Sequence, residues 1–348
     1  MDRKIAVLGT GANGASIAAD LTEAGLDVVL IDQWPQHVEA MLENGITIRM
    51  PEETRVVPVR AIHLCDVCTL DYKFDIIILV MKAYDTPWAC HLIKPYLKDN
   101  GILVGAQNGM TIDAIAEVVG VERTMGCVIE ITSQMFEPGI VDRQSPHERS
   151  WFAVGGMGKK ASTWEAEVRN LLSNSGVAII TNKIESAKWM KLISNSTTLA
   201  TSAIFGLPMA EAAKTPKFRQ IMLAAGAEAL AAGQEAGYEI EPIFGLTEKE
   251  VHKSNQLVAL LLDKVTSSFI LPETITTILQ DQMKNRKSEV GDINGWVVTT
   301  SEEFSRKAPI NSAIVEISKR IKCGELKAST DNLQLLNQLA AQNTEGKE

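Results

Sequence analysis

Six residues near the start of the chain have the spacing of a turn that binds phosphate groups: Gly9-Thr10-Gly11-Ala12-Asn13-Gly14. In this pattern Gly9 permits a tight turn, Gly11 lets the backbone approach a pyrophosphate, and Gly14 lets a helix pack closely on a strand. The N-terminus of the following helix offers unpaired N–H groups to the phosphates, and Ala12 and Asn13 in the turn are candidate cofactor-binding residues. The turn therefore predicts a dinucleotide-binding site. The alternative is an ordinary glycine turn of an α/β domain.

A carboxylate after the second predicted strand bears on the choice of dinucleotide. Asp32 lies eighteen residues after Gly14, at the end of the apolar run Leu26–Ile31. A carboxylate in this position accepts hydrogen bonds from ribose hydroxyls and repels a 2′-phosphate. Residues 33–37 contain no Arg or Lys to neutralise such a phosphate. We therefore expect NAD as the cofactor in preference to NADP. The alternative is that Asp32 only caps the next turn.

Polar side chains also follow two later predicted strands. Lys82 comes directly after Val80-Met81, and Asn108 follows the strand expected at 102–104. Ligands of open parallel sheets bind beyond the carboxyl ends of the strands. Both residues are therefore candidates for binding the cofactor or the substrate.

The second half of the chain holds a lysine, an asparagine and two acids that could take part in catalysis. Lys191 and Asn195 are four residues apart and share one face of a predicted helix. Asp281 and Glu289 flank the segment that leads to Asn294-Gly295. Taken singly, a lysine is most often a solvated charge and Glu289 most often a helix-surface acid, so position alone does not assign them a role.

The elements that would position these residues differ between the two halves. The first half alternates strands and helices, which predicts a mostly parallel, doubly wound sheet with right-handed crossovers. Its expected strands or extended segments are 5–8, 26–31, 46–50, 56–62, 76–80, 102–104, 125–131, 152–154 and 177–180, and its expected helices are 15–24, 87–97, 112–119 and 162–172.

From about residue 185 the apolar periodicity becomes helical. Expected helices include 186–203, 217–236, 249–262 and 274–286, and Pro208, Pro242 and Pro272 punctuate this half. We therefore predict a Rossmann-type dinucleotide-binding domain over 1–183, a helical substrate and dimerisation domain over 184–327, and a polar C-terminal tail over 328–348 that holds one more short helix.

The ordered set of motifs resembles the ketopantoate reductase family. The glycine turn is common to many families, but the full series in this order is far more specific. The matching segments are 9–14, the lysine segment 80–84, the Gln-Asn-Gly loop 107–109, the K-L-x-x-N helix 191–195, the Gln-Asp pair 280–281 and the E-x-x-x-x-N-G segment 289–295. The resemblance covers residues 3 to about 322. It implies a Rossmann-type sheet followed by an all-helical domain like the C-terminal domain of 6-phosphogluconate dehydrogenase.

The resemblance also implies a reaction, in which hydride moves between a nicotinamide and a 2-oxo acid. Lys191 would protonate the carbonyl oxygen, where an ammonium stabilises developing charge, and Glu289 would position that lysine or bind a substrate hydroxyl. Lys82 and Asn108 would lie near the cofactor, and the substrate would contact Asn108, Asn195, Thr277 and Asp281. The alternatives are the reduction of ketopantoate itself and a non-catalytic dinucleotide-sensing protein.

The chain departs from the family pattern at several positions. Leu199 replaces a second asparagine of the lysine helix, Thr277 replaces a serine, and Asp32 stands where basic residues are common. The region 239–272 is longer than in compact members. Together these departures weaken the specific assignment of ketopantoate as the substrate, and Leu199 favours a 2-oxo acid with an apolar or aromatic side chain.

Composition limits the classes of partner. The 348 residues are 45% hydrophobic and 22% charged, with a formal net charge of −9. This balance is that of a globular protein and lacks the basic stripe of a nucleic-acid binder. No apolar run reaches membrane-spanning length and no leader precedes the first strand, so we expect a cytoplasmic protein without a membrane partner. Apolar helices in the second half favour a homodimer.

The five cysteines do not form a metal-binding pattern. Cys65 and Cys68 form one C-x-x-C near His63, but no second pair follows at zinc-site spacing. We expect reduced thiols that are mostly either buried or without a functional role, and no metal.

Overall fold

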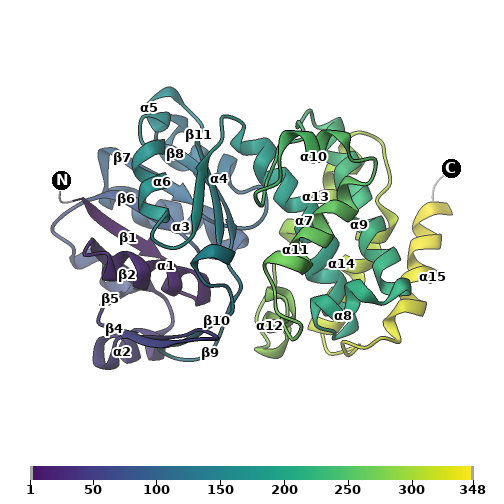
Figure 1. Ribbon diagram of the computed structural model, residues 1–348, viewed down its shortest axis with the longest axis horizontal. Coiled ribbons are helices and arrows are strands. Elements are labelled where there is room, and N and C mark those ends of the chain that lie inside the picture. Colours follow the sequence, from purple (N-terminus) through teal and green to yellow (C-terminus); the bar gives the residue numbers. More distant parts are fainter. Residues whose placement is uncertain (1–2, 346–348) are drawn as a thin grey trace. The chain divides into compact units, whose positions relative to one another are not determined.

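The computed structural model describes residues 3–345 and divides the chain into two compact units (Figure 1). The first contains the residues through 107 together with 111–185, and the second contains 108–110 together with those from 186 onward. The short segment 108–110 thus belongs to the second unit, although sequence reasoning assigned it to the first domain. The helix expected in the C-terminal tail is present and extends to residue 345, and it packs against the preceding helix within the second unit.

The first unit is built on an eight-stranded sheet with the order β12-β11-β8-β7-β6-β1-β2-β5. All neighbouring strands are parallel except β8 and β11, which are antiparallel. This arrangement confirms the predicted Rossmann-type fold. The strands are β1 (Lys4–Leu8), β2 (Asp27–Asp32), β5 (Arg60–His63), β6 (Phe74–Leu79), β7 (Leu97–Gly105), β8 (Thr124–Glu130), β11 (Trp151–Gly156) and β12 (Val177–Ile180).

Helices cover both faces of this sheet, because alternate strand residues point to opposite sides. Ile5 and Val7 of β1 pack with α1, α2, α5 and α6, whereas Ala6 and Leu8 pack with α3 and α4. The continuous apolar strands are thus buried on both sides, as in most parallel sheets. The helices are α1 (Ala12–Glu23), α2 (Pro35–Asn44), α3 (Thr86–Ile93), α4 (Ile112–Val119), α5 (Lys159–Ser162) and α6 (Glu165–Leu172).

A second, four-stranded sheet has the order β4-β3-β10-β9. It combines β3 (Ile46–Arg49) and β4 (Thr54–Val57) with β9 (Ser133–Glu137) and β10 (Ile140–Arg143). The single extended segment expected at 56–62 is in fact divided at Pro58, which lacks an N–H for a ladder bond, so that β4 and β5 enter different sheets. The predicted helix 87–97 also ends early, at Ile93, and β7 begins at Leu97.

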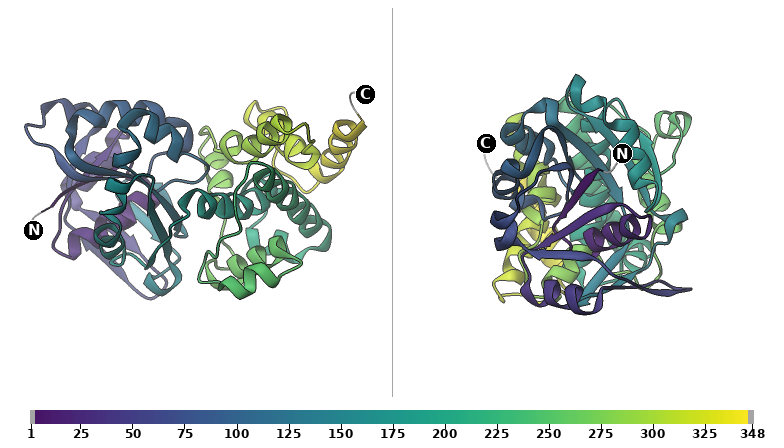
Figure 2. Two further views of the ribbon diagram at one scale, coloured as in Figure 1. Left: turned by 90° about the horizontal axis from the view of Figure 1, so that it is seen from above. Right: turned by 90° about the vertical axis from the view of Figure 1, so that its left-hand side faces the viewer.

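The second unit consists of packed helices, which Figure 2 shows from two further directions. Its first helix, α7, is buried over most of its length, and its buried hydroxyls bond to carbonyls three or four residues back. The helices are α7 (Ile184–Phe205), α8 (Met209–Lys214), α9 (Pro216–Glu235), α10 (Glu248–Lys253), α11 (Leu257–Ser268), α12 (Thr277–Met283), α13 (Val290–Glu303), α14 (Pro309–Lys322) and α15 (Asn332–Glu345).

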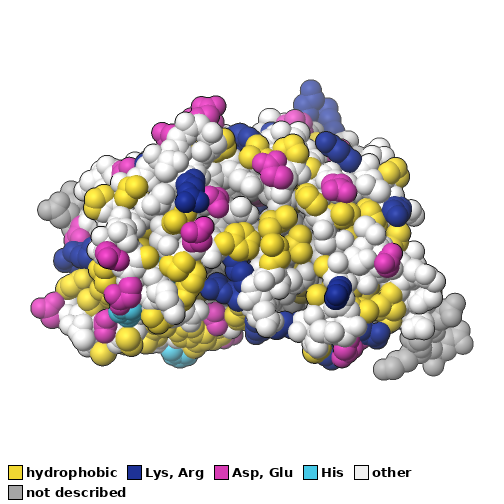
Figure 3. Space-filling model, turned by 90° about the horizontal axis from the view of Figure 1, so that it is seen from below, with side chains coloured by type: hydrophobic (Ala, Val, Ile, Leu, Met, Phe, Trp, Pro, Cys, Tyr) yellow, Lys and Arg dark blue, Asp and Glu magenta, His cyan; other side chains and the backbone are white. Residues whose placement is uncertain are grey.

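Acidic and basic side chains are interspersed over the face of the molecule that Figure 3 shows. Within residues 3–345, none of the helices is both long enough and apolar enough to cross a membrane.

Candidate functional site

The glycine turn lies between β1 and α1, and its glycines have different surroundings. Gly9 has a φ of 90°, and a side chain there would overlap with Met81. A side chain on Gly14 would overlap with the carbonyl oxygen of Gly9, so close packing of α1 requires this glycine. Around Gly11, by contrast, a Cβ atom would meet nothing within 4 Å.

This open space lies at the N-terminus of α1, where no side chain caps the helix. The first N–H groups of a helix have no partner within it and favour an anion. The residues present therefore fit the pyrophosphate of a dinucleotide, which would approach the backbone at Gly11 and face the N–H groups of Ala12 and Asn13. The Asn13 side chain is held by Ser133 of β9, whose hydroxyl donates to Asn13 Oδ1 over 2.5 Å.

Asp32 is buried and ties the glycine turn to the end of β2. Its Oδ2 accepts from the N–H of Thr10 at 2.7 Å and from the Thr10 hydroxyl at 3.2 Å. Its Oδ1 accepts from the N–H of Trp34 at 2.9 Å, which closes the turn that follows β2. Asp32 therefore does cap the next turn. A carboxylate has about four acceptor sites, so it retains capacity for a ribose hydroxyl.

His37 holds the other side of Thr10, a contact that sequence reasoning missed. The N–H of Gly139 donates to His37 Nδ1 at 2.9 Å, so this nitrogen is an acceptor and carries no proton. His37 Nε2 must then be the protonated nitrogen and donates to the Thr10 carbonyl at 2.8 Å. Thr10 is thus fixed through both its N–H and its carbonyl. Because Gly139 lies 102 residues further along the chain, no local pattern marked His37.

Lys82 follows β6 and is half-buried. The backbone around it is fixed by Gln107, whose Nε2 donates to the carbonyl of Met81 at 2.8 Å and to the hydroxyl of Thr86 at 2.9 Å. The ends of β6 and β7 are therefore cross-linked by one amide side chain. The predicted role of Lys82 near the cofactor stays a prediction.

In the second unit, α7 carries Lys191 and Asn195 one helical turn apart. Both are buried, with 9% of Lys191 and 1% of Asn195 exposed. Asn195 Nδ2 donates to Asn108 Oδ1 over 2.9 Å, so two predicted substrate-binding residues from distant parts of the sequence are in contact. The Lys191 Nζ atom lies 5.0 Å from the ring centroid of Phe244, a residue that sequence reasoning did not identify.

Close packing between α7 and α9 fixes the position of this lysine. A Cβ atom on Gly226 would overlap with Thr197, and one on Gly233 would overlap with the ring of Trp189. Trp189 also donates from Nε1 to the carbonyl of Ala229 at 3.1 Å. Helix α7 therefore packs against α9 both before Lys191, at Trp189, and after it, at Thr197.

The remaining predicted residues lie on or next to α12 and α13. Thr277 is the first residue of α12, and its buried hydroxyl has no hydrogen-bond partner among residues 3–345. Thr276 caps the same helix and donates to the carbonyl of Leu199 at 2.9 Å, which ties α12 to α7. Asp281 and Glu289 are both 4% exposed. Their predicted roles toward substrate and Lys191 stay predictions.

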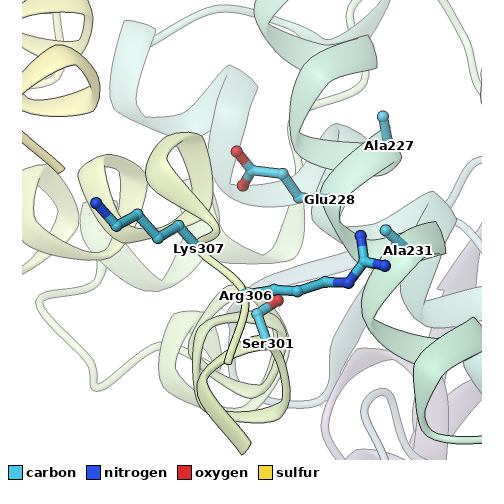
Figure 4. Close-up of a pocket in the computed structure, with 6 residues that line it drawn as sticks. All are labelled: Ala227, Glu228, Ala231, Ser301, Arg306 and Lys307. Carbon is cyan, nitrogen blue, oxygen red and sulfur yellow. The ribbon is translucent and has the colours of Figure 1, made fainter. Parts of the chain in front are cut away.

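A cavity of about 360 Å³ lies elsewhere in the second unit (Figure 4). It is lined by charged groups that already have partners. Glu228 accepts from the N–H groups of Ile310 and Asn311, both at 2.9 Å, and burial raises the pKa of Glu228. Arg306 pairs with Glu235, and Lys307 donates to the Thr344 carbonyl. These contacts join α9 to α14 and to the segment that precedes it.

The cysteines are unlike those of a metal centre. Cys65, Cys68 and Cys323 are exposed, whereas Cys90 and Cys127 are buried, and burial raises the pKa of Cys90 to about 12. In the described part of the chain, no group of three or more His, Cys, Asp or Glu side chains is placed so that it could hold a metal ion.

Comparison with known families gave two matches that together span most of the chain. Residues 5–155 match the family model described as ketopantoate reductase PanE/ApbA, and residues 183–322 match the model described as ketopantoate reductase PanE/ApbA C terminal.

Individual relatives agree with this result. A 2-dehydropantoate 2-reductase of Archaeoglobus fulgidus is 24% identical over 329 residues, which cover 92% of this chain and 99% of the relative. The ternary structure of D-mandelate dehydrogenase with NADH and anilino(oxo)acetate has a TM-score of 0.80 at 20% identity, covering 95% of this chain and 99% of that one. A dimeric ketopantoate reductase from Staphylococcus aureus has a TM-score of 0.69 at 19% identity, covering 93% of this chain and 100% of that one.

Proposed function

The chain belongs to the ketopantoate reductase family, and from this premise we propose that Lys191 is the proton donor in the reduction of a 2-oxo acid. The chain is an oxidoreductase of that family, and its cofactor is a nicotinamide dinucleotide. The observation that carries the proposal is the buried pair on α7, in which Lys191 lies one turn before Asn195 and Asn195 binds Asn108.

The chemistry follows from these side chains. When bound, the reduced nicotinamide supplies a hydride to the carbonyl carbon of the substrate. Lys191 stabilises the negative charge that develops on the carbonyl oxygen and then transfers its proton there. A site shielded from water strengthens this effect. Glu289 orients the ammonium or accepts a hydrogen bond from a substrate hydroxyl.

The asparagine pair suits the carboxylate of a 2-oxo acid. The bond between Asn195 Nδ2 and Asn108 Oδ1 uses one donor of the first side chain and the acceptor of the second. The two N–H donors of Asn108 can then face a negatively charged group. Thr277 adds a hydroxyl donor to this set.

We further propose that NADH is preferred to NADPH because the buried Asp32 carboxylate repels a 2′-phosphate. Asp32→Ala should narrow the difference between the binding free energies of NADH and NADPH by roughly 1–3 kcal/mol, the scale of a charged hydrogen bond. Because Asp32 also holds Thr10, the variant should bind both NADH and NADPH more weakly than the wild type. The informative quantity is therefore the ratio of the two dissociation constants, measured by fluorescence titration. Tighter binding of NADPH by the wild-type protein would overturn this preference.

The substrate we propose has an apolar or aromatic side chain. Leu199 lies one turn beyond Asn195 on α7, where its side chain is largely buried, and it offers no hydrogen bond to a substrate hydroxyl. In support, a protein of similar fold binds NADH together with anilino(oxo)acetate, an aromatic oxo acid.

The test compares kcat/KM for phenylglyoxylate, 2-oxoisovalerate and ketopantoate with NADH. We expect phenylglyoxylate to be at least as good a substrate as ketopantoate, and Leu199→Asn to shift the ratio toward ketopantoate. A site built for a hydroxyl discriminates strongly, so a preference of about a hundredfold for ketopantoate would contradict this assignment. Cofactor binding without turnover of any of the three acids would instead favour the dinucleotide-sensing alternative.

We also propose that the chain forms a homodimer. The dimeric enzyme from Staphylococcus aureus, whose fold is similar, supports this proposal. Size-exclusion chromatography coupled to light scattering should give twice the mass of one chain. A mass of one chain at micromolar concentration would rule the dimer out.

A further inference from the structure

Phe244 occupies a backbone conformation that is costly for its side chain. The N–H of Leu246 donates to the carbonyl of Ile243 at 3.0 Å, and the two residues inside this turn, Phe244 and Gly245, have φ angles of 60° and 73°. Positive φ at both central positions is the pattern of a type I′ turn, which favours Gly, Asn and Asp. A bulky residue with this φ is an outlier, so something must hold Phe244 there.

The contacts of the buried Phe244 ring explain why the residue is held in this conformation. The side chain is 1% exposed, and its ring lies next to that of Phe269, with centroids 5.4 Å apart. The Nζ atom of Lys191 lies over the ring, 5.0 Å from the centroid. The strained turn thus brings an aromatic face to the ammonium group of the proposed proton donor.

We propose that Phe244 is a positioning residue for Lys191, whose ammonium its ring holds through a cation–π interaction. The inference rests on the proposed function, because it matters to catalysis only if Lys191 is the acid. A ring face attracts the ammonium but has no lone pair to take its proton. The ring therefore fixes the position of the ammonium nitrogen without accepting a proton from it. Strained residues at active sites often serve such preorganisation.

Fluorination of this ring tests the proposal with little change of shape. Fluorine withdraws electrons from the ring face and weakens its attraction for a cation. Phe244 is replaced by its mono-, di- and trifluorinated analogues, and NADH-dependent reduction of phenylglyoxylate is measured. We expect kcat to fall stepwise, by about tenfold with three fluorines, as befits a partly dehydrated cation–π contact. The KM for NADH should not change.

A second readout does not depend on activity. In protein labelled with ¹³C at the lysine ε-carbon, the Lys191 signal is assigned by its loss in Lys191→Arg. The ring current of Phe244 should displace this signal, and trifluorination should alter its shift in the protein without cofactor.

Phe218 provides a matched control. It is 3% exposed and carries the Nζ of Lys217 at 4.8 Å from its ring centroid. It packs against Phe205, which lies fourteen residues after Lys191 on α7, or about 21 Å along the helix. Trifluorination of Phe218 should leave kcat and the Lys191 signal unchanged.

The outcomes separate the two proposals. If Lys191→Ala is inactive but kcat is flat or rises across the Phe244 series, the positioning role is wrong and the proposed function stands. If Lys191→Ala turns over at the wild-type rate, the proposed function is wrong, and the positioning role is wrong with it.

Discussion

At the scale of single residues, two glycines of the turn have different roles, one in packing and one in binding. The carbonyl oxygen of Gly9 leaves no room for a side chain at Gly14, whereas the space beside Gly11 is open. Gly11 also has an ordinary φ of −60°. A methyl group at Gly11 should therefore leave the fold intact and occupy the space that the pyrophosphate needs.

Gly11→Ala should weaken NADH binding by about 1–3 kcal/mol, the usual cost of forcing an extra methyl group into a packed site. The dissociation constant is measured by fluorescence titration, and the melting temperature without cofactor should stay close to that of the wild type. Gly14→Ala, in contrast, should lower the melting temperature. An unchanged affinity for NADH in Gly11→Ala would place the pyrophosphate elsewhere.

Sequence reasoning selected as candidates the residues that a local pattern marks. The glycines, Lys191 and Asn195 belong to this group. It missed His37, Thr276 and Phe244, because their importance depends on partners far away in the chain. It placed Asn108 beyond a strand end but could not foresee its bond with Asn195, which is 87 residues away.

At the scale of elements, the small sheet is joined to α1 through two cations that share Asp20, the buried Arg143 of β10 and the partly exposed Arg55 of β4. Arg143 of β10 donates to Asp20 of α1 at 2.6 Å, and both side chains are almost fully buried. Arg143 also donates to the carbonyls of Ser145 and Ser175, at 2.8 and 2.6 Å. This sheet carries Ser133 and leads into Gly139, the residues that hold Asn13 and His37. Arg143 therefore supports the glycine turn indirectly.

Arg143→Ala should lower the free energy of unfolding by about 3–5 kcal/mol, because it leaves the Asp20 carboxylate buried with part of its pairing lost. Urea unfolding measures this change. Arg49→Ala is the matched control in the same sheet, since its pair with Asp142 is long, at 3.8 Å, and exposed, and such pairs contribute about 0–1 kcal/mol. Equal effects of the two variants would show that the Arg143 pair does not anchor the sheet.

The strongly apolar strands were predictable, whereas in the small sheet the sequence predicted extended segments at β3 and part of β4 but not β9 and β10. The run at 76–80 predicted β6 because a strand buried on both faces is continuously apolar. Strands β9 and β10 are short and partly polar, and their sequences mix Gln, Glu, Asp and Arg with apolar residues. The Pro138-Gly139 pair between them is a turn signal that could have revealed the hairpin.

At the scale of the whole molecule, the sequence predicted the order of a dinucleotide-binding fold followed by helices. Two family models match these parts in the same order. What local patterns could not supply is the grouping of 108–110 with the second unit and the packing of α15 on α14. Both depend on long-range contacts. We propose that this organisation serves one reaction, with Lys191 as its acid.

The most direct test of that claim is single-turnover hydride transfer from NADH to phenylglyoxylate in wild type, Lys191→Ala and Lys188→Ala. Lys188 is a control on the same helix, also buried, with 3% of it exposed. We predict that Lys191→Ala slows the transfer by about 10²–10⁴-fold, the usual contribution of a general acid, while its affinity for NADH stays near wild type and Lys188→Ala keeps its rate. Transfer at the wild-type rate in Lys191→Ala would contradict the account, and a loss confined to Lys188→Ala would assign the proton to that lysine instead.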